Sequence, residues 1–401
     1  MKILFLTHML PYPPTDGARI RSFNLLKTLA SRHEVSLVSF ISETTRQEDI
    51  EELRGFVCDL QTVFRPQKYL VKDLLRGVCT SEPFTIINYR SDQMTELVGR
   101  KLSEGIEVVH CEHLNMAQYA PAGRGFKRVI DMHNVESEIM RRYAEKAGNP
   151  LKALYSGMTA KKLARYERDV LKGFDLCAAV STRDADHMRA FCLNTVVVDN
   201  GVDLDVFIRR EKAVDTPKLV YTGWMKYHAN NDAARFFCAD IFPAIRKNIA
   251  EVTVDIVGKE PSEEVLRLGE IDGVNVTGAV PDIRPFISGA AVYIVPLRVG
   301  GGTRLKILEA MATGIPIVST SVGCEGIGLT HEKDILIADS AEEFACQTLR
   351  LLGDAPLRQR LAVKARELVE ERFSWKMIGE KLLDSYNSLG AGEARYKEIS
   401  L

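Results

Sequence analysis

A glycine-rich turn that runs into a short helical segment carries the residues best suited to chemistry. In VGGGTRLKILEAMATG (299–314), three consecutive glycines lead into a predicted helix that Gly314 ends. The first N–H groups of a helix are unpaired and its dipole is positive there, so an anion is favoured, and glycines let a phosphate approach closely. Arg304 adds a planar, permanently charged fork that suits phosphate oxygens. The turn therefore predicts a phosphate site.

The same predicted helix adds a second cation and a carboxylate. At 100° per residue, Lys306 and Glu309 share a face. The ammonium group suits a diphosphate, and the carboxylate can accept hydrogen bonds from vicinal hydroxyls such as those of a ribose. The predicted ligand is a nucleoside diphosphate that carries a further group. The alternative is a solvated ion pair on a plain turn.

A second set of polar residues follows predicted strands in the first half of the chain. Gly17 opens a predicted helix whose first turn holds Arg19 and Arg21, which again suits an anion. His133 and Asn134 come just after the apolar run that ends in DMH. We expect these residues to line a ligand site, and the alternatives are a turn with solvated arginines and a structural histidine.

The segment HCEH (110–113) has the residue types of a metal site but not the spacing. His110 and His113 point to opposite faces of a strand, so they do not converge on an ion. The eight cysteines are scattered without a C-x-x-C pair, which argues against zinc and suits a reducing compartment. We predict no metal site, and we expect His113, at the end of its strand, to line the ligand pocket.

The elements that must position these residues alternate between strand and helix along the whole chain. Short apolar runs separated by helical patterns imply parallel sheets covered on both faces. The alternation pauses at 201–217, and 401 residues exceed one usual core. The sequence thus predicts an α/β protein with two doubly wound, Rossmann-like domains facing a central cleft. Their expected limits are 1–205 and 206–374, with a helix at about 375–392 that packs back on the first domain.

Charge and hydropathy restrict the partners. The formal net charge of -1 argues against nucleic acid. The N-terminal apolar run is too short for an export signal, and no segment approaches the ~20 apolar residues of a membrane span, so a cytoplasmic protein is expected. Residues 138–172 hold nine basic and four acidic side chains, a net charge of +5. This segment can contact an anionic membrane, and an ordinary solvated surface is the alternative.

Several motifs together resemble glycosyltransferase family 4. They are PLRVGGGTRLKILEAMATGIPIVSTSVGCEGI, preceded by GAVPDIRPFISGAAVYIV, together with VVVDNGVDLDVF, YTGWMKYHANNDAARFF and YPPTDGARIRSFNLLKTLA. In style the chain is closest to bacterial sugar transferases of exopolysaccharide and exosortase systems. The resemblance covers the whole chain. It implies a GT-B hexosyltransferase that transfers a sugar from a UDP- or GDP-sugar to a glycan or lipid-linked acceptor, with retention and without an essential metal or other cofactor.

The resemblance also implies roles for individual residues. Arg304 and Lys306 bind the diphosphate, Glu309 binds the ribose, and His133 lies near the reacting sugar. Further donor-binding residues are expected at Gly223, Lys226, Gly278, Val280, Gly301, Gly302 and Thr303, and acceptor or phosphate contacts at Gly17, Arg19, Arg21, His113 and Asn134.

The chain departs from the family pattern at Gly301, where the first Glu of the E-x7-E motif is expected, so the donor sugar stays open. No second carboxylate suggests itself as a nucleophile, which favours front-face displacement. The alternatives are a nucleotide-sugar epimerase of the same architecture and a sugar-binding protein without catalysis.

Overall fold

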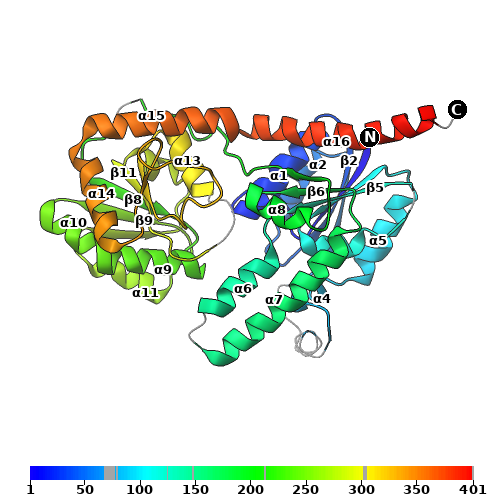
Figure 1. Ribbon diagram of the computed structural model, residues 1–401, viewed down its shortest axis with the longest axis horizontal. Coiled ribbons are helices and arrows are strands. Elements are labelled where there is room, and N and C mark those ends of the chain that lie inside the picture. Colours follow the sequence, from blue (N-terminus) through cyan, green and yellow to red (C-terminus); the bar gives the residue numbers. More distant parts are fainter. Residues whose placement is uncertain are drawn as a thin grey trace. The chain divides into compact units, whose positions relative to one another are not determined.

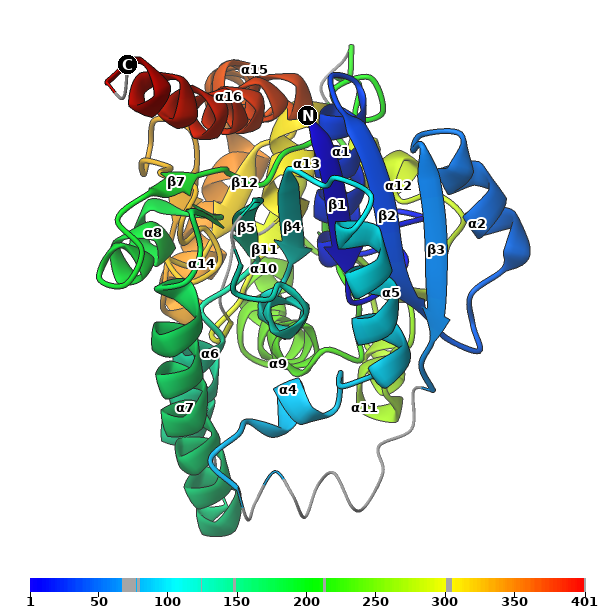
Figure 2. The same ribbon diagram turned by 90° about the vertical axis from the view of Figure 1, so that its right-hand side faces the viewer.

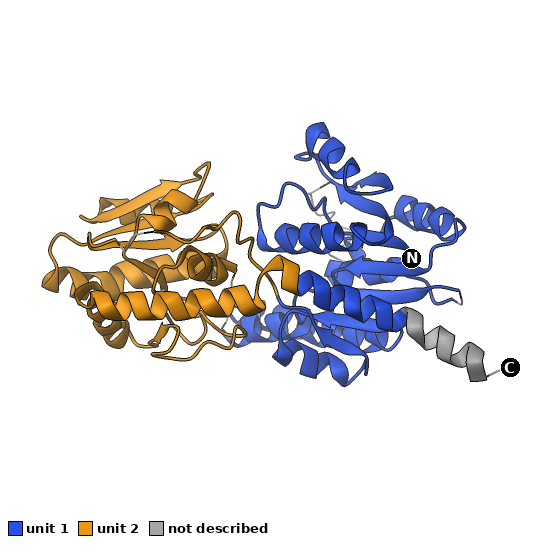
Figure 3. Cartoon of the chain, turned by 90° about the horizontal axis from the view of Figure 1, so that it is seen from above, with its two compact units in different colours: residues 1–199, 378–401 blue, residues 200–377 orange. Residues whose placement is uncertain are grey.

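The computed structural model forms two compact units, which Figure 3 distinguishes by colour. Unit 1 comprises residues 1–199 and 378–401, and unit 2 comprises residues 200–377. The residues that the structure describes are 1–66, 77, 80–123, 125–146, 149–211, 214–300 and 305–399, without the side chains of 146 and 390–399.

Unit 1 is built on a parallel sheet whose described strands follow the order β3-β2-β1-β4-β5-β6-β7 (Figures 1 and 2). The strands are β1 (Lys2–Thr7), β2 (Glu34–Ile41), β3 (Asp59–Phe64), β4 (Val108–Glu112), β5 (Lys127–Met132), β6 (Leu176–Ala179) and β7 (Thr195–Val197). Chain order reverses between β1 and β4, which makes their carboxyl ends the switch point at which open sheets bind ligands.

Helices cover this sheet, and the C-terminal helix α16 returns to it. The helices are α1 (Gly17–Ala30), α2 (Gln47–Arg54), α4 (Phe84–Ile87), α5 (Asp92–Leu102), α6 (Glu136–Lys146), α7 (Pro150–Leu171), α8 (Thr182–Arg189) and α16 (Trp375–Ile399), with a 3₁₀ segment at Leu114–Tyr119. Tyr386 of α16 is fully buried. Gly379 lies so close to α1 that a Cβ there would come within 2.8 Å of the hydroxyl of Thr28. The docking of α16 on unit 1 therefore depends on a small residue and a buried aromatic residue.

Unit 2 repeats the architecture with the strand order β10-β9-β8-β11-β12-β13. The strands are β8 (Lys218–Thr222), β9 (Thr253–Val257), β10 (Val274–Gly278), β11 (Val292–Val295), β12 (Ile317–Ser319) and β13 (Leu336–Ile337). The helices are α9 (His228–Phe236), α10 (Phe242–Asn248), α11 (Glu263–Arg267), α12 (Arg284–Ser288), α13 (Leu305–Thr313), α14 (Ala341–Gly353) and α15 (Ala355–Arg372), with a π segment at Phe237–Ile241 and a 3₁₀ segment at Leu268–Glu270. The switch point of this sheet lies between β8 and β11.

The predicted doubly wound α/β architecture is confirmed in both units. Strands such as β1 are buried on both faces, which explains why they appear in the sequence as continuous apolar runs. The sequence analysis missed β3, an edge strand in which only Leu60 and Val63 are buried, so that it leaves no continuous apolar run. Within the described part of the chain, no helix combines the length and the apolar character needed to cross a bilayer.

Candidate functional site

Three histidines stand directly after adjacent strands of the unit 1 sheet. His8 follows β1, His113 follows β4 and His133 follows β5. The ring centroids are 4.8 Å apart for His8 and His113, 5.6 Å for His113 and His133, and 6.4 Å for His8 and His133. The histidines thus gather at the switch point of the sheet, where a ligand is expected.

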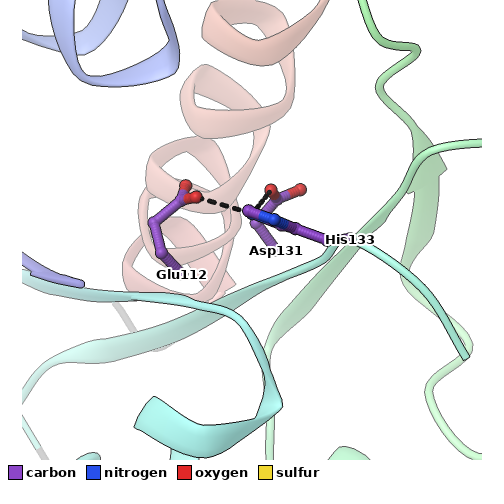
Figure 4. A group of neighbouring side chains, drawn as sticks. All are labelled: Glu112, Asp131 and His133. Atoms are coloured by element: carbon purple, nitrogen blue, oxygen red, sulfur yellow. Dashed lines mark hydrogen bonds and ion pairs between the residues drawn. The ribbon is translucent and has the colours of Figure 1, made fainter. Parts of the chain in front are cut away.

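His133 lies between two buried carboxylates (Figure 4). Its Nε2 is 2.9 Å from Oε2 of Glu112 and 3.2 Å from Oδ2 of Asp131. Burial alone would lower the pKa of His133, but hydrogen bonds to Asp131 and Glu112 and their negative charges outweigh it and raise this pKa to about 9. His133 is therefore an imidazolium cation at neutral pH.

Arg21 completes the charge balance from helix α1. Its Nε and Nη2 each donate to one oxygen of Asp131 at 2.6 Å, and its Nη1 donates to the carbonyl of Asp199 at 3.1 Å. The guanidinium is only 1% exposed. The paired guanidinium group holds the carboxylate of Asp131 in place. The position of Arg21 therefore gives no support to the phosphate contact predicted for it.

Glu112 extends the network to the C-terminal helix. It accepts hydrogen bonds from Ser22 at 2.5 Å and from Nε2 of His110 at 2.8 Å, and Nδ1 of His110 lies 2.5 Å from the hydroxyl of Tyr386. Burial would raise the pKa of Glu112, but the hydrogen bonds and charges of His110 and His133 keep it well below the usual value. A chain of buried polar contacts thus joins His133 to α16.

The same three residues could be taken for a metal site, because a ligand atom from each of Glu112, Asp131 and His133 lies within 4.8 Å of the others. Arg21 already holds both oxygens of Asp131, however, and Ser22 holds Glu112. A metal ion would have to displace a guanidinium group, so the arrangement is better described as an ion-pair network.

His8 is a further residue at this edge that sequence reasoning missed, as it missed Glu112 and Asp131. Its side chain is 8% exposed, and its buried Nδ1 has no hydrogen-bond partner among the described residues. Burial, followed by the nearby His113 and His133, lowers the pKa of His8 well below 6.5. A neutral imidazole with an unused nitrogen therefore lies beside the charged one. Its position directly after the first strand was the available signal.

The other residues predicted in unit 1 have partners of their own. His113 adopts a positive φ of 77°, and its Nε2 lies 3.1 Å from Glu136. Burial would raise the pKa of Glu136, but the hydrogen bond and charge of His113 lower it, and Asn134 acts in the same direction. Arg19 pairs with Asp16 at 3.0 Å. Asp16 also accepts from the backbone N–H of Arg19 as the N-cap of α1, which begins at Gly17. The start of α1 therefore already has a carboxylate where an external anion was predicted.

In unit 2, Lys306 of α13 reaches the carboxyl end of β8. Its Nζ lies 2.9 Å from Oδ1 of Asn230, 3.3 Å from the hydroxyl of Tyr221 and 4.4 Å from the centre of that ring. A Cβ at Gly223 would come within 2.9 Å of Nζ, so glycine leaves room for the ammonium group. Asn230 and Tyr221 were not predicted from the sequence.

Glu309 lies one turn further along α13 and is half-buried. Burial raises its pKa to about 7, although the charge of Lys306 acts in the opposite direction. About half of these carboxyl groups are thus protonated at neutral pH in the ligand-free protein. A ligand that donates hydrogen bonds to Glu309 would favour the ionised form.

The remaining donor-site predictions fall in different places. Gly278 ends β10 with a φ of 67°, and Val280 packs partly buried against the unit 2 core. Lys226 is largely exposed and pairs with Glu260 at 3.1 Å, which weakens its availability to a phosphate. Four predicted residues lie outside the described part of the chain, namely Gly301, Gly302, Thr303 and Arg304.

Comparison with known proteins finds similar sequences for this chain. Residues 216–354 match the family model "Glycosyl transferases group 1", and the match includes the Gly223, Lys306 and Glu309 region. The chain is 19% identical over 393 residues to an "Uncharacterized 44.6 kDa protein in cps region" of Klebsiella pneumoniae, covering 94% of this chain and 97% of that protein. A lipopolysaccharide core biosynthesis mannosyltransferase of Rhizobium leguminosarum bv. viciae is 23% identical over 258 residues, 60% of this chain and 72% of its own length.

Solved structures share the fold of both units. Sucrose-phosphate synthase from Thermosynechococcus elongatus superposes with a TM-score of 0.75 at 17% identity, covering 98% of this chain and 100% of that one. The Anabaena protein HepE, solved with UDP, gives a TM-score of 0.68 at 14% identity over 97% and 100% of the two chains. The architecture is therefore GT-B.

The family match and the fold together make the chain a glycosyltransferase of the hexosyltransferase type. More narrowly, its residues 216–354 match the model of the group 1 glycosyltransferases. The predicted class of enzyme is thereby confirmed, and nothing found favours the epimerase or the non-catalytic alternative. Assignment to family 4 and retention of configuration stay predictions.

Proposed function

We propose that this enzyme transfers a sugar, with retention, from a UDP- or GDP-sugar to a glycan or lipid-linked acceptor in surface polysaccharide synthesis. Unit 2 takes the donor and unit 1 the acceptor. The UDP bound to HepE and the origin of one relative in a cps region support this proposal. The scattered cysteines support a reducing, cytoplasmic setting, and no metal ion is part of the proposal.

The single observation that carries the proposal is the position of Lys306. Its ammonium group lies beside Asn230 and Tyr221 at the switch point of the unit 2 sheet, where Gly223 leaves it space. When the anomeric C–O bond breaks, negative charge builds on the departing diphosphate, and a cation placed there beforehand stabilises it. Glu309, one turn away, is suited to accept hydrogen bonds from the ribose hydroxyls.

His133 contributes a second fixed cation, in unit 1. Its Nε2 is held by Glu112 and Asp131, which fixes the ring orientation and the charge. Because this imidazolium keeps its proton up to a pKa of about 9, it suits hydrogen-bond donation to a substrate oxygen better than removal of an acceptor proton. In front-face displacement the departing phosphate takes that proton. His133 is therefore assigned a stabilising role and not that of a base.

The decisive experiment compares Lys306→Ala with Lys247→Ala, which removes an exposed lysine of the same unit. Nucleoside diphosphate release from UDP- and GDP-sugars should fall about 100-fold or more in Lys306→Ala and stay unchanged in Lys247→Ala. Both variants should melt within a few degrees of the wild type. Near-normal release by folded Lys306→Ala would remove the assignment.

The identity of the reaction is tested with the products. Transfer or hydrolysis releases UDP or GDP, an epimerase changes only the sugar, and a binding protein changes neither. A thermal-shift panel of UDP, GDP, ADP and their sugars identifies the base, because a specific ligand stabilises the folded state by mass action. Release that a chelator abolishes would contradict the metal-free reaction.

A further inference from the structure

Helices α6 and α7 form a hairpin that extends beyond the carboxyl edge of the unit 1 sheet (Figure 2). Helix α7 packs against the protein along one face, which holds Ser156, Ala160, Leu163, Glu167 and Leu171. At 100° per residue, these five positions fall within about 80° of one another. Among the described residues of α7, the side chains on the opposite face are largely exposed, and a soluble helix normally presents polar side chains there.

The first two turns of α7 present large apolar side chains on that opposite face. Leu151 is 77% exposed, Leu154 64%, Tyr155 42% and Met158 41%. Their spacing of i, i+3, i+4 and i+7 places all four within about 100° of one another, turned away from the packed face. Single exposed apolar residues are ordinary, but four on one unpacked stripe mark an interaction surface.

The same face becomes cationic where α7 continues towards the sheet. Lys161, Arg165, Arg168 and Lys172 follow on this side, and Asp169 is the one acidic residue among them. Arg165 and Arg168 lie 3.9 and 3.3 Å from Asp169. These four cations are exposed. Along the helix axis, an apolar half is thus followed by a half with an excess of positive charge.

This order fits an anionic bilayer. Leu151 and Met158 are seven residues apart, a rise of about 10 Å along α7, so the four apolar side chains form a compact patch of the kind that interfacial helices bury about 5–10 Å into the head-group boundary. The cationic half would then lie level with the lipid phosphates. At the tip, Oδ1 of Asn149 accepts from the backbone N–H groups of Leu151 and Lys152 at 2.9 and 3.3 Å, so fewer unpaired donors enter the lipid.

We propose that the stripe formed by Leu151, Leu154, Tyr155 and Met158 inserts into the interface of an anionic lipid bilayer, while the cations that follow it bind the head groups. A second protein chain fits less well, because four side chains are few beside the 20–30 residues per side of a standard interface. The lipid contact goes beyond glycosyl transfer and does not depend on it.

The test is flotation of the full chain with vesicles, without nucleotide. The wild type should float with phosphatidylcholine vesicles that contain about one quarter phosphatidylglycerol, and much less with phosphatidylcholine alone. The double variant Leu151→Ser/Leu154→Ser should reduce the bound fraction roughly tenfold or more. The matched control is Leu193→Ser, because Leu193 is 94% exposed elsewhere in unit 1, and it should bind as the wild type does.

The charge contribution is tested separately with Arg165→Glu/Lys172→Glu against Lys27→Glu, an exposed lysine on α1. The first variant should lose the preference for phosphatidylglycerol, and the control should keep it. Equal flotation of wild type and both α7 variants would overturn the proposal. So would a wild type that ignores vesicles but forms a dimer, by light scattering, that Leu151→Ser/Leu154→Ser abolishes. Thermal shifts by UDP or GDP, which report donor binding, should be equal in all five proteins.

Discussion

The carboxyl edges of the two sheets place charged side chains in different surroundings. In unit 1, His133 and Arg21 face Glu112 and Asp131, so each buried charge already has a protein partner. In unit 2, Lys306 contacts the neutral Asn230 and Tyr221. Unit 1 thus holds its charged side chains in a buried network of ion pairs, whereas the hydrogen bonds of Lys306 to Asn230 and Tyr221 join an ammonium group to neutral side chains.

This difference teaches where each kind of mutation should act. Removing a partner from a completed buried network leaves an uncompensated charge, so it should damage stability first. Removing Lys306 takes a hydrogen-bond donor from the neutral side chains of Asn230 and Tyr221, so we expect it to damage ligand binding first. Variants of Arg21 and His133 test this difference in unit 1, and a variant of Glu309 tests it in unit 2.

Arg21→Ala should produce the largest loss of stability. Asp131 would stay buried without its guanidinium partner, which typically costs about 3–5 kcal/mol. The control is Arg19→Ala, two residues away on α1, whose half-exposed pair with Asp16 should contribute less than about 1 kcal/mol. Differential scanning calorimetry of the two variants measures the difference. Equal melting temperatures would show that the network does not hold unit 1 together.

His133 should make stability depend on pH on the alkaline side. Its pKa is raised to about 9 in the folded protein from 6.5 in the unfolded chain, so its contribution is complete below pH 6.5 and is lost as the pH rises through 9. The shift corresponds to a loss on the order of 3 kcal/mol across that window. His133→Gln should remove this part of the pH dependence in melting curves from pH 6 to 10. An unchanged slope would mean that His133 is neutral already.

The fold could be predicted from the sequence because parallel strands that are buried on both faces appear as continuous apolar runs, such as Ile3 to Leu6. Sequence reasoning missed Glu112 and Asp131 because they are single polar residues inside such runs. Arg21 was expected to bind an anionic ligand, yet its partner Asp131 is 110 positions away. Only the strand order brings β1, β4 and β5 together. The positions of Lys306 and Glu309 on one helix, in contrast, follow from local spacing.

The smallest expected effect concerns Glu309 and has the opposite sign to that of His133. Because burial holds its pKa at about 7 in the free protein, roughly a tenth of these carboxyl groups is ionised at pH 6 and nine tenths at pH 8. A ribose that donates hydrogen bonds selects the ionised form, so binding of the matching nucleoside diphosphate should tighten about tenfold over this range. Isothermal titration calorimetry of the wild type and Glu309→Gln measures the effect, and the variant corrects for titration of the phosphate itself. Parallel pH profiles in the two proteins would show that Glu309 does not bind the ribose, and the proposed donor contacts on α13 would then be reduced to Lys306.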